Sequence, residues 1–275
     1  MSADYSTVTE TPGGGATQRN LDMLYARYAF AAGYCEGRDV LEVACGPGPG
    51  LGYLARKARR VVGGDYTESL ARLARQHYAG RLPVLRLDAH DLPFSDQSFD
   101  VVILFEAVYY LRAFDRFLGE CRRLLRRGGV LLICEANPER PDFNPSPFSV
   151  RYYSAAELRD VLGRHGFDVE MLSAFPVRES SRRAGLIVLL RRGAVALHLI
   201  PKTMKGKAVL KRLVYGKLKP FPAEVTEGMA AVHEPVPLPG NAAGDGYEVI
   251  YAVARAPRER HATPREDHGV PSALR

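Results

Sequence analysis

The chain has 275 residues, a formal net charge of +7 and 46% hydrophobic residues, enough to bury a substantial core in one large domain or two small ones. No run reaches the roughly 18 uninterrupted apolar residues of a membrane-spanning helix, since Arg191 and Arg192 interrupt the closest one. The four cysteines lack the C-x-x-C spacing of a structural zinc site, so no metal is expected.

The N-terminal part, residues 1–35, is predicted to be an arm followed by a helix. Residues 1–15 are polar and end in three glycines, which indicates a mobile arm. They lack the basic-then-apolar pattern of a secretory signal, and unpaired cysteines suit a reducing compartment, so a cytoplasmic protein is expected. Residues 17–34 carry apolar side chains at helical spacing, and this helix either packs on the core or covers a ligand.

The most informative stretch is V-L-E-V-A-C-G-P-G-P-G at 40–50. An apolar run breaks into a glycine-rich turn and a helical pattern follows. This predicts a buried strand, a turn without side-chain bulk and a helix whose free N–H groups face the turn. A nucleotide-like cofactor fits such a turn. The dinucleotide fingerprint G-x-G-x-x-G fails, because Gly46 and Gly48 match but Leu51 stands at the third glycine position.

A second apolar run, 60–66, contains Asp65, which lies 19 residues after Gly46. A carboxylate at the end of the second strand can accept hydrogen bonds from both hydroxyls of a ribose. The alternative is that Asp65 caps the helix that starts near Thr67. Asp65 therefore supports a nucleoside without distinguishing one cofactor from another.

Three later segments complete the pattern. Residues 82–87 form a predicted strand followed by D-A-H-D-L-P-F at 88–94, whose bland interpretation is a charged surface turn. Residues 98–106 and 124–133 give two more buried strands, the first introduced by S-F-D and the second by a glycine turn. Together with E-x-x-C-G-x-G from Glu42 and the acid at Asp65, these motifs resemble the class I S-adenosylmethionine (SAM)-dependent methyltransferases in order and spacing over about residues 36–175.

The repeated β–α alternation predicts a parallel sheet covered by helices on both faces. The resemblance implies more: an α/β, Rossmann-like sheet of seven mostly parallel strands, the last one antiparallel and expected at 247–254. We expect the methyltransferase domain to span 36–255, with a helical insertion at about 176–245 between strands six and seven. Residues 256–275 are charged and proline-bearing, and a disordered tail is predicted.

The resemblance also implies which residues hold SAM. The glycine turn would admit the methionine part, Glu42 would orient its amino group, and the acid at 65 would hold the ribose. Asp88 and the backbone N–H of Ala89 would recognise adenine, with Tyr66 flanking the ring. The complete set of expected cofactor-binding residues is Glu42, Ala44, Cys45, Gly46, Gly48, Asp65, Tyr66, Asp88, Ala89 and Phe105.

The acceptor side is less specified. The loop 105–110 is expected to face the transferred methyl group, and it lacks the [ND]-P-P-[YF] sequence of enzymes that methylate nucleobases or glutamine. Glu106, Tyr109 and His90 are candidate bases for deprotonating a hydroxyl or an enol. Each has a structural alternative: a fixed polar contact, a packing ring and a turn residue, respectively.

Positive charge is concentrated in one segment. Residues 178–219 contain 12 Lys and Arg against one acidic residue, whereas the rest of the chain has 26 basic and 30 acidic residues. Within it, 182–199 and 204–218 are helical candidates. This basic insertion is interpreted as an acceptor-site lid or a docking surface for anionic groups, including a membrane surface; nucleic acid is disfavoured because no clustered aromatic motif accompanies the charge.

Three functions compete on these observations. The favoured one is a SAM-dependent methyltransferase that acts on an oxygen, carbon or nitrogen atom of a small-molecule acceptor. The second is a membrane- or RNA-associated binding protein on a methyltransferase scaffold, peripheral at the membrane. The third is a nicotinamide-dependent oxidoreductase, which the residue at position 51 and the adenine-type loop disfavour. The acceptor's identity stays open.

Overall fold

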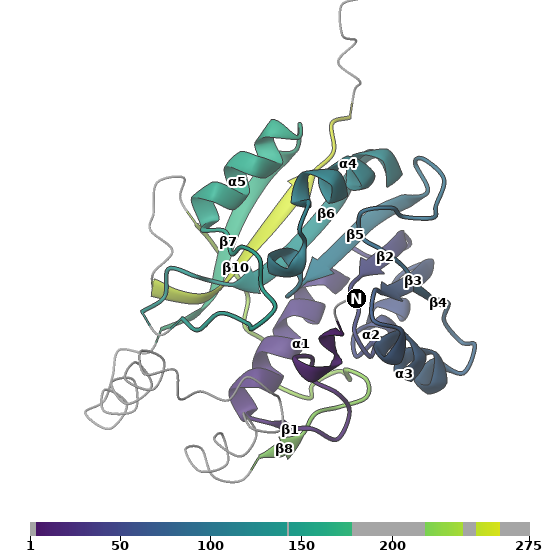
Figure 1. Ribbon diagram of the computed structural model, residues 1–275, viewed down its shortest axis with the longest axis vertical. Coiled ribbons are helices and arrows are strands. Elements are labelled where there is room, and N and C mark those ends of the chain that lie inside the picture. Colours follow the sequence, from purple (N-terminus) through teal and green to yellow (C-terminus); the bar gives the residue numbers. More distant parts are fainter. Residues whose placement is uncertain (1–3, 142, 178–217, 239–245, 259–275) are drawn as a thin grey trace, which may run out of the picture.

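The computed structural model describes residues 4–141, 143–177, 218–238 and 246–258. A sheet forms the centre, with α4 and α5 on one face and α1, α2 and α3 on the other (Figure 1). The strands of this sheet are β2 (Asp39–Val43), β3 (Arg60–Asp65), β4 (Val84–Arg86), β5 (Phe99–Phe105), β6 (Leu125–Ala136), β7 (Asp168–Pro176), β9 (Val236–Pro237) and β10 (Tyr247–Arg255). The helices are α1 (Gln18–Ala32), α2 (Leu51–Ala55), α3 (Glu68–Tyr78), α4 (Phe114–Leu124) and α5 (Ala155–Arg164), with 3-10 turns η1 (Tyr5–Thr7) and η2 (Val108–Tyr110).

The strand order is β4-β3-β2-β5-β6-β10-β7-β9. Neighbours from β4 to β6 are parallel, and β10 runs antiparallel between β6 and β7. The predicted mostly parallel sheet with a late antiparallel strand is confirmed. The sheet has one strand more than expected, because Val236 and Pro237, inside the expected insertion, pair with Ser173 and Leu172 at the edge of β7.

Both faces of the sheet are buried, which explains why its strands are nearly continuous apolar runs. Along β6, Leu132 and Cys134 pack in the core beneath α1, whereas Leu131 and Ile133 pack in the core beneath α5. The amphipathic helices contribute one apolar face each. The carboxyl ends of the parallel strands lie side by side at one end of the sheet, which is called the crest below. A hydrophobic core packs on each face of the sheet.

The ends of several elements differ from the sequence prediction. Helix α4 stops at Leu124 because Leu125 already pairs with Phe99 in the sheet, so β6 starts four residues earlier than the glycine turn indicated. Helix α5 begins with a capping box: Ser154 Oγ accepts from the Glu157 amide at 3.2 Å, and the Glu157 carboxylate accepts from the Ser154 amide at 2.9 Å.

Residues 1–15 were expected to be a mobile arm, but the described part of this segment, from residue 4, makes defined contacts. The Tyr5 amide donates to Thr67 Oγ1, and the Gly13 amide donates to the Phe221 carbonyl. A short strand, β1 (Gly15–Ala16), pairs antiparallel with β8 (Lys219–Pro220). Because these partners are far away in the sequence, the polar composition of the arm gave no sign of them.

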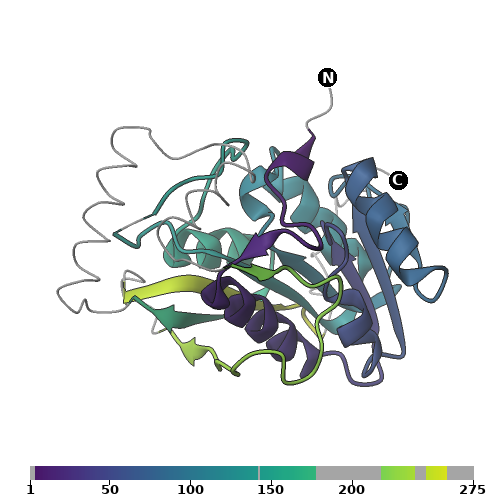
Figure 2. The same cartoon turned by 90° about the horizontal axis from the view of Figure 1, so that it is seen from below.

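The described part of the expected insertion, residues 218–238, is called the strap. It runs alongside α1 at the lower edge of Figure 2. Glu227 accepts from the hydroxyls of Tyr25 on α1 and Tyr53 on α2, and Glu224 pairs with His77 on α3 at 2.9 Å. The strap thus ties three helices together.

The helical candidate at 182–199 lies outside the described residues, as does the candidate at 204–218 except for its last residue. Most of the basic insertion and the tail from 259 lie outside them too. In the described ranges, no helix combines the length and the hydropathy that crossing a bilayer demands.

Candidate cofactor-binding site

The glycine-rich turn follows β2 at the crest. Three of its residues have positive φ: Ala44 at 58°, Gly46 at 58° and Gly48 at 77°. The Gly48 amide donates to the Cys45 carbonyl, and the Cys45 amide donates to Gly64 on β3, so the turn is fastened to the next strand. A Cβ at position 48 would lie 3.1 Å from three side chains, so that glycine is required by packing as well as by φ.

Asp65 ends β3 beside this turn and is buried, with 6% of its surface exposed. Its Oδ2 accepts from the Gly46 amide and its Oδ1 accepts from the Thr67 amide, both at 2.8 Å. Burial raises the pKa of Asp65, against the lowering effect of these two donors. The N-cap residue of α3 is Thr67 and not Asp65. Asp65 instead connects the glycine turn, through Gly46, to the start of α3, through Thr67. Each of its carboxylate oxygens keeps a second acceptor position.

Glu42 on β2 is the most deeply buried acid of the crest's first strand, with 1% exposed. Its Oε1 accepts from the Tyr28 hydroxyl at 2.6 Å, whereas Oε2 is buried without a hydrogen-bond partner. Burial raises the pKa of Glu42 to about 7. Tyr28 can lie there because residue 50 is glycine: a Cβ at Gly50 would lie 1.8 Å from the Tyr28 ring.

Asp88 and Ala89 follow the third strand, β4, whereas Tyr66 follows the second, β3. Asp88 Oδ1 accepts from the His90 amide at 2.9 Å and pairs with His90 Nδ1 at 2.7 Å. Burial raises the pKa of Asp88 while these contacts lower it, and the net direction is down. Ala89 is buried and Tyr66 is 36% exposed. His90 therefore holds the Asp88 turn, and its Nε2 lies 3.4 Å from the Ala113 amide.

The fourth strand end carries Phe105 and Glu106. Glu106 has a φ of 52°, and its amide donates to the Cys134 carbonyl at 2.7 Å. Its carboxylate accepts from the Tyr109 hydroxyl at 3.2 Å and lies 3.5 Å from the Arg27 guanidinium. Burial raises the pKa of Tyr109 well above its usual value, so Tyr109 acts as a hydrogen-bond donor to Glu106.

An aromatic contact connects the strand end that carries Glu42 with the one that carries Glu106. Phe105 packs edge-on against Tyr28, with ring centroids 5.7 Å apart. Glu42 and Glu106 are thus held by neighbouring residues of α1, Tyr28 and Arg27. Sequence reasoning placed Tyr28 on the helical stripe but gave it no partner, and it did not single out Arg27.

The ring of Tyr5 packs against three other aromatic rings near the crest. Its ring lies 4.8 Å from that of Tyr110, 6.1 Å from Phe148 and 6.4 Å from Tyr66, centroid to centroid. The methyl group of Thr9 would touch a Cβ at Gly46. Nothing in the polar arm's composition distinguished Tyr5, because its three ring partners come from separate parts of the chain.

In the described ranges no three His, Cys, Asp or Glu side chains gather so that they could hold a metal ion. All four cysteines are buried and free. Burial raises the pKa of Cys35 to about 12, which makes its thiol unreactive at neutral pH.

Residues 41–133 match a protein family described as a methyltransferase domain. A probable S-adenosylmethionine-dependent methyltransferase of Mycolicibacterium smegmatis is 39% identical over 158 residues, which are 55% of this chain and 59% of that protein. A fatty-acid O-methyltransferase of the same organism is 42% identical over 106 residues, 38% of this chain and 39% of that protein. The chain thus spans between about two fifths and three fifths of the length of these relatives.

Among solved structures, a SAM-dependent methyltransferase from Thermotoga maritima, described as a possible histamine N-methyltransferase, superposes with a TM-score of 0.54. The alignment covers 84% of this chain and 87% of that one at 15% identity, which demonstrates a common fold. The matched family region includes all four strand ends described above.

Proposed function

Through residues 41–133 the chain belongs to the class I SAM-dependent methyltransferase family, and on this premise we propose that it binds SAM and transfers a methyl group to a small-molecule acceptor. The observation that carries the proposal is the buried, unpartnered Oε2 of Glu42 at the crest. A buried carboxylate oxygen without a donor is costly, and a ligand ammonium group removes that cost.

The other residues fit the rest of SAM. Asp65 has acceptor positions for the ribose hydroxyls next to the glycine turn that its Oδ2 fixes. Asp88 is kept ionised by His90, as recognition of an exocyclic amine requires. We assign the methionine part to the backbone of the turn at Gly46 and Gly48, which lies beside Asp65. Ala44, Cys45 and Phe105 are assigned to the same site because they belong to this turn and to the neighbouring strand end.

When bound, SAM supplies a methyl group on a positively charged sulfonium. The protein's contribution to such a displacement is mainly the positioning of the two reactants. Glu106 is the side chain we assign to proton uptake from the acceptor, because Arg27 and Tyr109 fix its carboxylate at the crest. Tyr109 and His90 serve as positioning residues, since the hydroxyl of the first and both ring nitrogens of the second are already engaged.

The relatives' names include lipid acceptors, which supports a small-molecule or lipid acceptor over a macromolecule. The nicotinamide alternative receives no comparable support. The membrane and RNA alternative depends on residues 178–219, nearly all of which lie outside the described ranges.

Titration calorimetry with S-adenosylhomocysteine and with NADH tests the proposal. We expect saturable binding of S-adenosylhomocysteine and none of NADH. The Asp88→Ala variant should bind S-adenosylhomocysteine more weakly. The control is Asp96→Ala, which should bind it normally, because Asp96 is exposed and precedes the amino end of β5, away from the crest. Binding of NADH in place of S-adenosylhomocysteine would refute the proposal.

A further inference from the structure

A second unpartnered acid lies next to the crest. Glu135, the penultimate residue of β6, has no exposed surface, and neither of its carboxyl oxygens has a hydrogen-bond partner. Ser173 on β7 is equally buried, and its Oγ also lacks a partner. Both residues pair in register with Ile250 of β10, so they flank that residue on one face of the sheet. The mechanism above uses neither of them.

Glu135 is close to Glu106. The Glu106 amide donates to the carbonyl of Cys134, the residue before Glu135, so the two acids lie at the ends of the neighbouring strands β5 and β6. Burial raises the pKa of Glu135 well above its usual value, and the negative charge of Glu106 raises it further. Both effects favour the neutral form of Glu135, which can both donate and accept a hydrogen bond.

A row of aromatic rings leads to these acids. Tyr5 contacts Tyr110, whose ring lies 4.5 Å from Tyr109. Tyr109 stacks on Tyr152 at 4.3 Å with an interplanar angle of 20°, and Tyr152 meets Phe143 at 4.6 Å. The rings come from the N-terminal turn, η2 and the loop between β6 and α5. The Tyr109 hydroxyl donates to Glu106, so the row adjoins that acid.

We propose, on the basis of the methyltransferase function above, that the acceptor is a neutral, largely apolar phenol whose hydroxyl lies between Glu106 and Glu135. The rings suit a planar apolar body, since aromatic rings pack favourably against one another in offset-stacked or edge-on arrangements. A carboxylate head group would bring a further negative charge beside Glu106 in a poorly hydrated place, which is unfavourable. A hydroxyl instead donates to Glu106 and accepts from Glu135.

The step balances with the groups named. The acceptor's O–H proton goes to the Glu106 carboxylate. A bond forms between the acceptor's oxygen and the methyl carbon, and the carbon–sulfur bond breaks with its electron pair on sulfur. The products are a methyl ether, a neutral thioether and protonated Glu106. Glu135 is a positioning residue here, because it holds the oxygen and exchanges no proton.

Three probes that differ only in the head group test this proposal: 4-octylphenol, 4-octylbenzoate and 4-octylaniline. Binding is measured by calorimetry in the presence of S-adenosylhomocysteine, and turnover is measured with SAM. We expect 4-octylphenol to bind and to be methylated at least tenfold more efficiently than the other two. Preference for the benzoate or the aniline, or failure of the phenol to bind the S-adenosylhomocysteine complex, overturns the proposal.

Variants assign the acids. Glu135→Leu should raise the KM for 4-octylphenol about tenfold, the loss expected for one buried hydrogen bond, without weakening S-adenosylhomocysteine binding. Because it removes an unpartnered buried acid, this variant should be no less stable than the parent. Ser173→Ala is the matched control, with an expected change under twofold. An unchanged KM in Glu135→Leu contradicts the role of Glu135. Failure of the unmodified protein to bind S-adenosylhomocysteine would instead contradict the methyltransferase function itself.

Discussion

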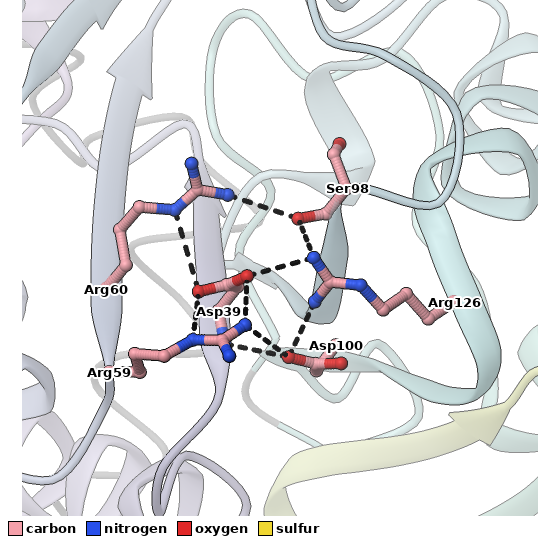
Figure 3. Close-up of polar contacts among 6 residues, drawn as sticks. All are labelled: Asp39, Arg59, Arg60, Ser98, Asp100 and Arg126. Carbon is pink, nitrogen blue, oxygen red and sulfur yellow. Dashed lines mark hydrogen bonds and ion pairs between the residues drawn. The ribbon is translucent and has the colours of Figure 1, made fainter.

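The two ends of β2 carry buried acids with opposite properties. At the amino end, Asp39 accepts from Arg59 and Arg126, and Arg60 lies 3.6 Å away (Figure 3). Hydrogen bonds from Arg59 lower the pKa of Asp39 to about 2, despite burial and with further help from Arg126. Three residues later, at the crest, burial raises the pKa of Glu42 to about 7, and a single tyrosine hydroxyl is its hydrogen-bond partner.

The difference separates stability from function. The acids of the amino end, Asp39 and Asp100, are satisfied by the protein's own arginines, so they have no capacity left for a ligand. At the crest the chain leaves the acids Glu42 and Glu135 short of donors, at a cost in folding free energy. Polar groups that are incompletely satisfied in the free protein are typical of sites whose missing partner is a ligand.

The largest expected effect is at the crest. Asp65→Ala should weaken S-adenosylhomocysteine binding at least about 100-fold, because hydrogen bonds to a charged group contribute about 1.5–3 kcal/mol each and two ribose hydroxyls would lose theirs. Calorimetry measures the affinity, and circular dichroism checks that the fold is retained. Unchanged affinity would remove Asp65 from the site.

Replacing Glu42 should separate its effect on stability from its effect on ligand binding. The folded pKa of Glu42 exceeds its usual value of 4.5, so its ionisation costs no stability below that pH, and stability is lost as pH rises from 4.5 to about 7. Glu42→Gln should therefore gain about 2–3 kcal/mol in unfolding free energy at pH 8, with little gain at pH 4.5, while binding S-adenosylhomocysteine more weakly. Urea denaturation at both pH values tests this; a variant destabilised at pH 8 would contradict the assignment.

The same pKa predicts how ligand affinity depends on pH. Only ionised Glu42 attracts an ammonium group strongly, so the affinity for S-adenosylhomocysteine should rise about 20-fold between pH 5.5 and 7.5 and then level off. In Glu42→Gln this rise should be absent. An equal pH dependence in both proteins would point to a different titrating group.

The smallest effect is expected at the amino end. The folded pKa of Asp39 is lowered below 3.8, so the stability it contributes is present above that value and is lost as pH falls toward 2. Asp39→Asn should cost about 1–2 kcal/mol at pH 7, a figure reduced for the exposure of its arginine partners, and should leave ligand affinity within twofold of the parent. If affinity falls with stability, the two ends of the strand are not independent.

Local patterns were sufficient for much of the fold. The alternation of strands and helices was predicted, and family resemblance predicted an antiparallel strand at 247–254, where the structure has β10. The positions of the glycine turn, Asp65 and Asp88 followed from their spacing, because parallel strands bring their carboxyl ends to one edge. The roles of these residues toward SAM stay predictions that the experiments above address.

Other features depend on contacts between distant segments. No spacing rule pairs Tyr28 with Glu42 through the gap at Gly50, places Tyr5 over Tyr110, or ties the strap to α1. The isolation of Glu135 is of the same kind, since a glutamate in an apolar run has the same sequence pattern whether or not a donor reaches it. The sequence by itself determined which groups arrive at the crest, because alternating strands and helices make the strands parallel and bring their carboxyl ends to one edge. Only the tertiary structure decided which of them are satisfied, because hydrogen-bond partners and burial arise from packing across the whole chain.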